Sequence, residues 1–332
     1  MKIFISLLLC LTILGVSEAC AQKDKSVKPK SKGELLFTSG FEKGSTVVHK
    51  SDSPSTDDDI IGKDQSVSGP NDWVEDIDKS PKLGYFSLQY QGGDTTMRFA
   101  RIIPEPGNPK NKVLHFWVNQ ANVDGMKSRI QANIYADKSK KTEGIKEFYQ
   151  SVKLYLPADM EVVKSFPEKI SWLTILEVWN NIQWVDDPYP YRLTVGIGKP
   201  GPEKSELHFM VDAEDYEYGD KKYIKLWHEM NTAIDVPIGR WFTLEYYIRE
   251  GNAQNGRFYM AITPEGGKKQ VIFDIANFTH NSKDPNPDGI TLWNPMKLYT
   301  SKKLVDFARS QGKALQFYWD DFTVWRNRQP ND

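Results

Sequence analysis

The sequence predicts an all-β protein, a single-domain β-sandwich of the jelly-roll kind with one short helix near its C-terminus. From residue 85 onward, short segments of alternating apolar and polar residues are separated by Gly, Pro, Asn and Asp, a pattern typical of half-buried strands and turns. These segments are 113–119, 129–135, 147–156, 172–179, 192–197, 206–213, 241–249, 257–263, 270–275 and 315–324. Their continuous succession favours one sandwich, spanning 35–326, over two smaller domains.

Two local signals fit this fold class. Between two of the predicted strands, Asn255-Gly256 supplies the residue types that adopt positive φ in a tight hairpin. The first convincing amphipathic helix comes only at 301–311, where Ser301 is the expected N-cap and Gly312 the expected stop.

The N-terminal part of the predicted domain is less regular. Residues 35–42 predict an opening strand. The stretch 51–78 is rich in Ser, Asp, Gly and Pro and predicts a long surface loop around a short anchor at Trp73 and Val74. It holds too few apolar residues to form a domain of its own.

Residues 1–19 predict an export signal. Met1-Lys2 precedes an apolar run, 3–16, that is too short to span a bilayer comfortably. Ser17-Glu18-Ala19-Cys20 resembles a bacterial lipoprotein cleavage box, although Leu usually stands where this chain has Ser17, and it makes Cys20 the expected lipidated residue. Residues 20–34, rich in lysine and poor in large apolar residues, then predict a flexible tether.

We therefore expect a protein of the cell surface or periplasm that meets the membrane only through a lipid anchor. The alternative is ordinary cleavage within Ala19-Cys20-Ala21, which gives a soluble secreted protein. An exported chain with no cysteine beyond Cys10 and Cys20 has no disulfide use for Cys20, which favours lipidation.

Composition excludes some classes of function. With 43 Lys+Arg against 44 Asp+Glu, the net charge of -1 predicts neither a nucleic-acid partner nor a basic membrane-binding surface. Aromatic residues make up 12% of the chain, although its mean hydropathy is only -0.56. Many of these rings must be core and strand residues, but such a chain also fits a β-protein that presents flat rings to sugars.

The segment 127–135 shows the clearest division between an apolar face for the core and a face of polar side chains that could form a functional site. A two-residue period places Ile130, Ala132 and Ile134 on one face of the strand. The other face carries Arg129, Gln131, Asn133 and Tyr135, which are a cation, two amides and a phenol. A polar face is normal in an antiparallel sheet, so the pattern gains meaning when neighbouring strands repeat it.

Other predicted strands carry polar faces of the same kind. The segment 192–197 leaves Arg192 and Thr194 opposite its apolar face, and 206–213 leaves His208 and Asp212. Glu177 shares one side of its strand with Trp179, so it lies either in a groove or in a core ion pair. Equally, His208 can be an ordinary solvated histidine, and the arginines can be paired with carboxylates across strands.

The chain resembles the concanavalin A-like jelly rolls of secreted bacterial polysaccharide lyases, of the heparin-lyase-like and alginate-lyase-like kinds. The resemblance covers most of the predicted mature chain in strand order. It rests on Ser39-Gly-Phe-Glu, Lys127-Ser-Arg-Ile-Gln-Ala, Trp241-Phe-Thr-Leu-Glu-Tyr-Tyr, Gly256-Arg-Phe-Tyr-Met-Ala-Ile and Tyr318-Trp-Asp-Asp-Phe-Thr-Val-Trp. The alginate-lyase central strand reads Arg-(Ser/Thr)-Glu-(Leu/Val)-Arg, whereas this chain lacks its acid and also the Gln-Ile-His of that family.

The resemblance implies β-elimination on an extracellular, acidic polysaccharide. Such chemistry needs amide or guanidinium donors to neutralise a uronate carboxylate, together with a base and an acid. It implies roles in carboxylate binding for Gln131, Asn133, Arg129 and Arg192, and in proton transfer for His208 and Tyr135. The implied sugar-binding residues are Glu177, Trp179, Trp184 and Tyr189. No nucleotide or redox cofactor is implied.

Two other functions stay open. In a non-catalytic glycan-binding lipoprotein, the same residues only bind. A glycoside hydrolase needs a carboxylate pair at a suitable spacing, and no Glu-x-Asp-x-x-Glu strand is present. A structural calcium ion is also open at 284–289, although Pro295 stands where the loop would need its glutamate. No zinc-ligand spacing joins the histidines.

Overall fold

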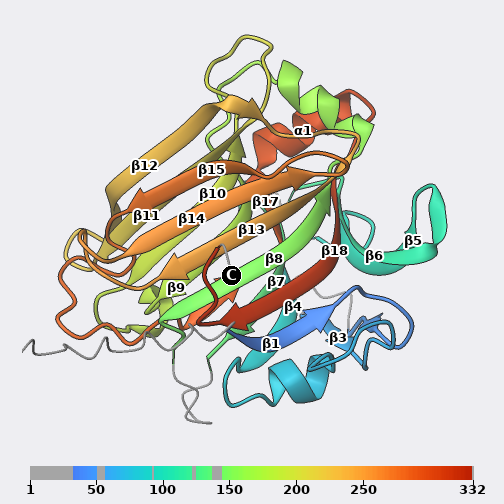
Figure 1. The fold of residues 1–332 in the computed structure, drawn as a ribbon. Coiled ribbons are helices and arrows are strands. Elements are labelled where there is room, and N and C mark those ends of the chain that lie inside the picture. The colour runs from blue at the N-terminus through green and yellow to red at the C-terminus, as the bar shows by residue number, and fades with distance from the viewer. Residues whose placement is uncertain (1–32, 51–56, 92, 122–124, 137–143, 331–332) are drawn as a thin grey trace, which may run out of the picture. The chain divides into compact units, whose positions relative to one another are not determined.

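The computed structural model describes residues 33–50, 57–91, 93–121, 125–136 and 144–330. The predicted export signal, Cys20 and nearly all of the predicted tether lie outside these residues. Within them, two eight-stranded antiparallel sheets pack face to face, and a third, two-stranded sheet pairs β2 with β3. The predicted all-β jelly roll with a short C-terminal helix is confirmed (Figure 1).

The first large sheet has the order β15-β14-β13-β8-β18-β6-β5, and β1 pairs with β18. The bounds of its strands are β1 Glu34–Ser39, β5 Arg98–Glu105, β6 Asn108–Val118, β8 Glu147–Tyr155, β13 Trp241–Arg249, β14 Arg257–Pro264, β15 Gln270–Ala276 and β18 Leu315–Arg326.

The second large sheet has the order β12-β11-β10-β9-β16-β7-β17, and β4 pairs with β7. The bounds of its strands are β4 Tyr85–Gln91, β7 Lys127–Tyr135, β9 Leu173–Asn180, β10 Tyr191–Gly198, β11 His208–Glu217, β12 Lys222–Asp235, β16 Leu292–Asn294 and β17 Lys297–Ser301. The strands of the small sheet are β2 Thr46–Val48 and β3 Asp59–Ile61.

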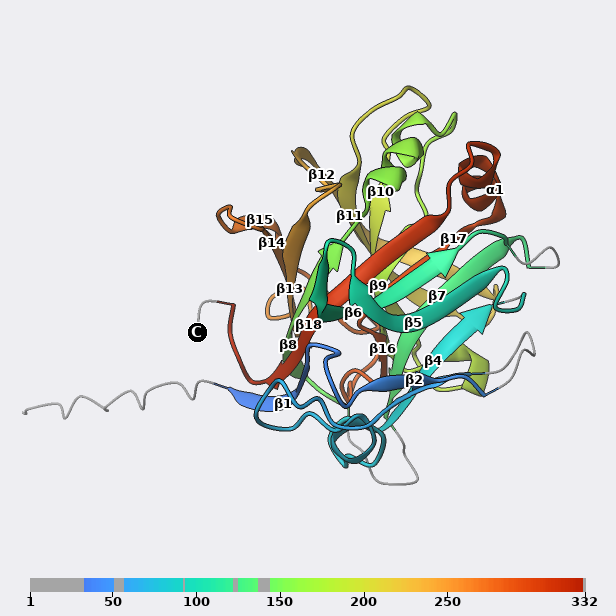
Figure 2. The ribbon, with the colours of Figure 1, turned by 90° about the vertical axis from the view of Figure 1, so that its right-hand side faces the viewer.

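The helical elements are short. They are η1 Trp73–Asp78, η3 Ala158–Ser165, η4 Gln183–Val185 and α1 Lys302–Ser310. As predicted, the Ser301 side chain caps α1 by accepting from the Leu304 amide, and Gly312 follows the helix at a φ of 69°. In both ribbon views α1 lies at one end of the sandwich and β1 at the other (Figures 1 and 2). No helix within the described ranges is long and apolar enough to cross a membrane.

The core lies between the two large sheets and confirms the predicted alternation on β7. Ile130, Ala132 and Ile134 are fully buried in it. At the N-terminal end, Trp73 is also fully buried, and its ring meets the ring of Phe37 at 4.7 Å, a contact worth about 0.5–1.5 kcal/mol beyond area burial. Trp73 is therefore the anchor that the sequence predicted.

Two local predictions are corrected. In the described part of 51–78, the chain forms β3 and η1 instead of one unstructured loop. The β13–β14 connection runs through 250–256, and neither Asn255 nor Gly256 has positive φ. Instead, the Asn255 side chain accepts from the Asn252 amide at 2.8 Å. A Cβ on Gly256 would stand 2.2 Å from the Asn277 carbonyl oxygen, so close backbone packing is what requires glycine there.

Candidate functional site

Two adjoining hollows form one groove on the face of the second sheet that points away from the core. The first hollow, of about 650 Å³, is lined by residues of β4, β7, β16, β17 and β9, together with η4, Arg192 of β10 and Tyr223 of β12. The second, of about 540 Å³, lies over β9, β10, β11 and β12. Glu177, Arg192 and Tyr299 line both hollows and mark their junction. The groove therefore crosses the strands from β4 to β12.

Strand register aligns polar side chains across this groove. Asn294 pairs with Glu177, Glu177 with Thr194, Thr194 with Asp212, and Asp212 with His228. These residues come from β16, β9, β10, β11 and β12. Because strands lie about 4.8 Å apart, the row extends across the groove and brings together residues that are far apart in the sequence.

The centre of the groove depends on β16 and β17, which are inserted between β7 and β9. Leu298 points into the core, where it is fully buried, so its neighbours Lys297 and Tyr299 belong to the opposite face. Asn294 and Tyr299 line the first hollow. Neither strand was predicted from the sequence, because Pro295 interrupts their alternation and the two pieces are short.

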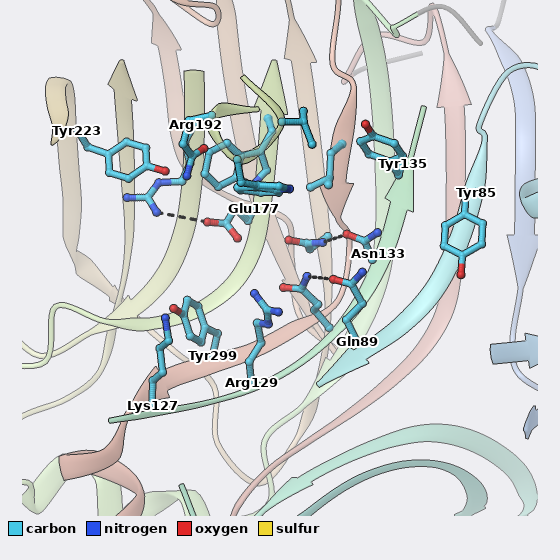
Figure 3. Close-up of a pocket in the computed structure, with 17 residues that line it drawn as sticks. Tyr85, Gln89, Lys127, Arg129, Asn133, Tyr135, Glu177, Arg192, Tyr223 and Tyr299 are labelled. Atoms are coloured by element: carbon cyan, nitrogen blue, oxygen red, sulfur yellow. Dashed lines mark hydrogen bonds and ion pairs between the residues drawn. The ribbon is translucent and has the colours of Figure 1, made fainter. Parts of the chain in front are cut away.

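A buried ion pair lies beneath the junction of the two hollows. The ammonium of Lys297 contacts the carboxylate of Glu177, and their side chains are 1% and 7% exposed. Arg192 lies 3.7 Å from the same carboxylate (Figure 3). Arg192 also pairs with Glu214. Burial favours a neutral Glu177, but Lys297 and Arg192 outweigh it and lower the pKa of Glu177. Burial lowers the pKa of Lys297 to about 8, although Glu177 opposes that shift.

The same lysine fixes the orientation of two amides. Its Nζ donates to Asn294 Oδ1 at 3.0 Å, and Asn294 Nδ2 donates to Asn133 Oδ1 at 3.0 Å. An ammonium group can only donate, so Asn294 must direct its oxygen toward Lys297 and its nitrogen toward Asn133. Asn133 must in turn direct its oxygen toward Asn294. The Nδ2 of Asn133 is thereby left as a donor.

A second chain of amides reaches the β4 edge. Gln131 Nε2 donates to Gln89 Oε1 at 3.0 Å (Figure 3). Gln89 Nε2 in turn donates to Asp57 Oδ2 at 3.3 Å. Burial raises the pKa of Asp57, and hydrogen bonds from the side chains of Ser87 and Gln89 partly offset this shift. The amide side chains over β7 and β4 are thus held in position by one another.

Tyr299 lies opposite Arg129 in strand register. The Lys297 Nζ is 5.1 Å from the centre of its ring, while the Lys127 Nζ and the Arg129 Cζ are each at 5.9 Å. Burial raises the pKa of Tyr299, and the charge of Glu177 adds to the shift, while Arg129 and Arg192 oppose it. The phenol therefore lies within a group of cations but remains protonated in neutral water.

Aromatic side chains form one wall of the first hollow. The rings of Trp179 and Trp184 meet at 4.9 Å, and Trp184 is 57% exposed. The guanidinium of Arg192 lies 3.9 Å from the centre of the Tyr223 ring. An exposed indole beside charged and amide groups is a surface on which a sugar ring can stack.

Most of the site residues predicted from the sequence meet in the first hollow. They are Arg129, Gln131, Asn133, Tyr135, Glu177, Trp179, Trp184 and Arg192. The structure adds residues that were not predicted from the sequence, namely Gln89, Lys127, Tyr223, Asn294, Lys297 and Tyr299. The strand alternation of Lys297-Leu298-Tyr299-Thr300 was the signal that could have revealed the last two.

Two predicted residues do not join them. His208 begins β11, and its Nδ1 lies 3.5 Å from the Ile234 carbonyl oxygen and 3.6 Å from Asp235, so it lines neither hollow. Tyr189 lines a separate depression beside Tyr218. The structure therefore does not bring either residue together with Gln131.

No metal site is visible in the described parts of the chain. Within them, no group of three or more His, Cys, Asp or Glu side chains could hold a metal ion. In the segment that the sequence left open for calcium, the Asp284 side chain accepts from the Asn286 amide at 2.9 Å, as in a simple turn.

Fold and groove together define a jelly roll with a polar, aromatic-walled cleft across one sheet. The chain matches no family model and no curated protein sequence. Among solved structures, it is similar to a glucuronan lyase from Trichoderma reesei, with 12% identity, a TM-score of 0.43, and coverage of 69% of this chain and 87% of that one.

Two further similar structures are alginate lyases. One is a mutant of Aly36B in complex with an alginate tetrasaccharide, with 12% identity, a TM-score of 0.42, and coverage of 69% and 84%. The other, from Aplysia kurodai, has 10% identity, a TM-score of 0.40, and coverage of 67% and 86%. The predicted resemblance to alginate-lyase-like jelly rolls is confirmed for the fold. These likenesses concern the fold alone, and the function proposed below depends on the site.

Proposed function

We propose that the protein is a polysaccharide lyase that cleaves a uronate-containing glycan by β-elimination. The observation that carries this proposal is the cross-strand pair of Arg129 and Tyr299 in the groove, with Lys127 and Lys297 around the same ring. In a uronate, the acidic proton sits on C5, the carbon that bears the carboxylate. A cation that holds the carboxylate and a group that takes the proton must therefore be close neighbours.

The proposed chemistry uses the chain's own side chains. Arg129, with the amide of Gln131 beside it, neutralises the carboxylate, so that the charge developing during proton removal is stabilised. The phenolate of Tyr299 takes the C5 proton, the C–H electron pair forms the C4–C5 double bond, and the C4–O bond breaks. The departing oxygen takes the proton back from Tyr299, which regenerates the phenolate.

Tyr135 belongs to a different part of the groove. It stands six residues beyond Arg129 on β7 (129 to 135), which is about 20 Å at roughly 3.3 Å per residue. It cannot act on the sugar held between Arg129 and Tyr299, so we assign it to the binding of a neighbouring unit.

The carboxylates of the groove do not favour glycoside hydrolysis. Glu177 contacts Lys297, Glu214 contacts Arg192, and Asp212 contacts Lys225 at 2.5 Å. A general acid must hold a proton, whereas Lys297 and Arg192 lower the pKa of Glu177 despite its burial.

A glycan-binding protein remains the second candidate, because one observation favours it. Burial raises the pKa of Tyr299, so the phenolate is a minor species near neutral pH. In a binding protein, the same phenol and the same cations would only hold the glycan.

Paired tyrosine variants test the assignment. Tyr299→Phe should lower kcat by about 10²–10⁴-fold, because it removes the proton-transferring oxygen and nothing else. Tyr135→Phe makes the same chemical change in the same hollow and should lower kcat far less. Because the phenolate is the reactive form and burial raises the pKa of Tyr299, kcat of the native protein should rise with pH from neutral to mildly alkaline. Equal effects of the two variants would refute the role of Tyr299.

A further inference from the structure

The two halves of the groove differ in charge. We call the part that lies in the first hollow alone the β4-side half and the part in the second hollow alone the β12-side half. The charged side chains of the β4-side half are Lys127 and Arg129, both cations. The β12-side half has Lys169 and Lys225, but also the carboxylates Asp212 and Glu214.

Each of these two carboxylates already contacts side chains of the protein. Asp212 contacts Lys225 at 2.5 Å and His228 at 2.9 Å. Glu214 contacts Arg192, and Arg192 is also paired with Glu177. A uronate carboxylate placed over β11 would meet Asp212 as a like charge and would compete with it for Lys225, both of which oppose binding.

The remaining surface of the β12-side half suits hydroxyl groups. Thr174 and Thr194 offer hydroxyls, and Asp212 can accept hydrogen bonds from a sugar. Met210 and Met230 add apolar surface next to Gly196, where a Cβ would stand only 3.1 Å from the Leu173 carbonyl oxygen. The bare backbone at this position keeps the floor of the groove low.

We infer that the glycan is of mixed charge, with a uronate unit over the β4-side half and neutral sugar units over the β12-side half. This inference rests on the proposed lyase function. It restricts the substrates from uronate-containing glycans in general to those that also contain neutral sugars. Polymers that alternate uronate with neutral sugars fit this groove, whereas homopolymers of uronate do not.

Two glycan classes test the inference. Elimination and equilibrium binding are measured side by side, with a homopolyuronate and with a polymer in which uronate alternates with neutral sugars. The alternating polymer should give kcat/KM and affinity that are higher by roughly tenfold or more. Equal or better cleavage and binding of the homopolyuronate overturns the inference. Tight binding of the alternating polymer without elimination supports the inference and refutes the lyase proposal.

A charge variant locates the origin of the preference. Asp212→Asn keeps the size of the side chain and removes the like charge, so the ratio of the two affinities should shift by about tenfold toward the homopolyuronate. Asp235→Asn, on the same face of the sheet but outside both hollows and beside His208, is the matched control and should leave the ratio unchanged. An unchanged ratio in folded Asp212→Asn protein would mean that Asp212 does not set the preference, which overturns the inference.

Discussion

At the scale of single residues, the buried pair of Glu177 and Lys297 connects the stability of the protein with the geometry of the site. The pair lies beneath the groove, and its lysine sets the orientation of Asn294 and through it that of Asn133. A buried ion pair adds little stability by itself, but losing one partner leaves a charge without compensation. The orientation of the amides in the site and the stability of the fold therefore depend on the same contact.

Removing one member of the pair should be costly. Glu177→Gln leaves the Lys297 ammonium buried opposite a neutral amide, and the free energy of unfolding should fall by about 3–5 kcal/mol. Adding Lys297→Met to that variant should recover much of the loss. Denaturant unfolding of the single and double variants measures both effects, and a cost below about 1 kcal/mol for the single variant would contradict this account.

The stability that the native protein gains from Glu177 should decrease in acid. Lys297 and Arg192 outweigh burial and lower the pKa of Glu177 below its ordinary value of 4.5. A lowered carboxyl pKa stabilises the folded state above the unfolded pKa, and this stabilisation is lost as pH falls through the folded pKa. The stability difference between native protein and Glu177→Gln should therefore narrow as the pH falls below the ordinary carboxyl value of 4.5.

Residue chemistry also explains which site residues could be predicted. The two-residue period of β7 correctly gave the face shared by Arg129, Gln131, Asn133 and Tyr135. The same period put His208 on the groove face but could not show its position along β11. His208 stands four residues before Asp212 (208 to 212), about 13 Å along the strand, and this offset removes it from the hollow.

At the scale of elements, strong local signals were predictable and weak ones were not. The cap of α1 at Ser301 and the strands β6, β8, β13, β14, β15 and β18 of the first sheet follow from local sequence, whereas β5 was not predicted. The strand β12 was missed because few of its side chains are buried, so it lacks an apolar period. The positions of these strands depend on tertiary pairing, which sequence periodicity does not reveal. β12 pairs with β11, and both β16 and β17 lie between β7 and β9.

The helix cap offers a prediction at this scale. Ser301→Ala removes the side-chain acceptor for the Leu304 amide and should lower the free energy of unfolding by about 1 kcal/mol. Ser310→Ala, at the exposed end of the same helix, should change it by less than about 0.5 kcal/mol. Urea midpoints at an unchanged m-value measure both. Equal midpoints for the two variants would show that the cap contributes nothing.

At the scale of the whole molecule, the predicted export and anchoring agree with the proposed action on a polysaccharide outside the cell. We propose that Cys20 carries the lipid. Expressed in a bacterium, the native chain should incorporate a labelled fatty acid and enter the detergent phase, while Cys20→Ser should do neither. Cys10→Ser is the matched control and should behave as the native chain does. An unlabelled native chain in the medium would instead support the soluble secreted form.

The most direct test of the account as a whole is the ultraviolet absorbance of unsaturated uronate, followed while the purified protein is incubated with a panel of uronate polysaccharides. β-Elimination forms the C4–C5 double bond, so the account predicts rising absorbance with at least one polymer, and the fastest rise with one that alternates uronate and neutral sugars. Unchanged absorbance with every polymer, together with retarded migration in gels containing one of them, would contradict the account and assign the groove to a glycan-binding protein.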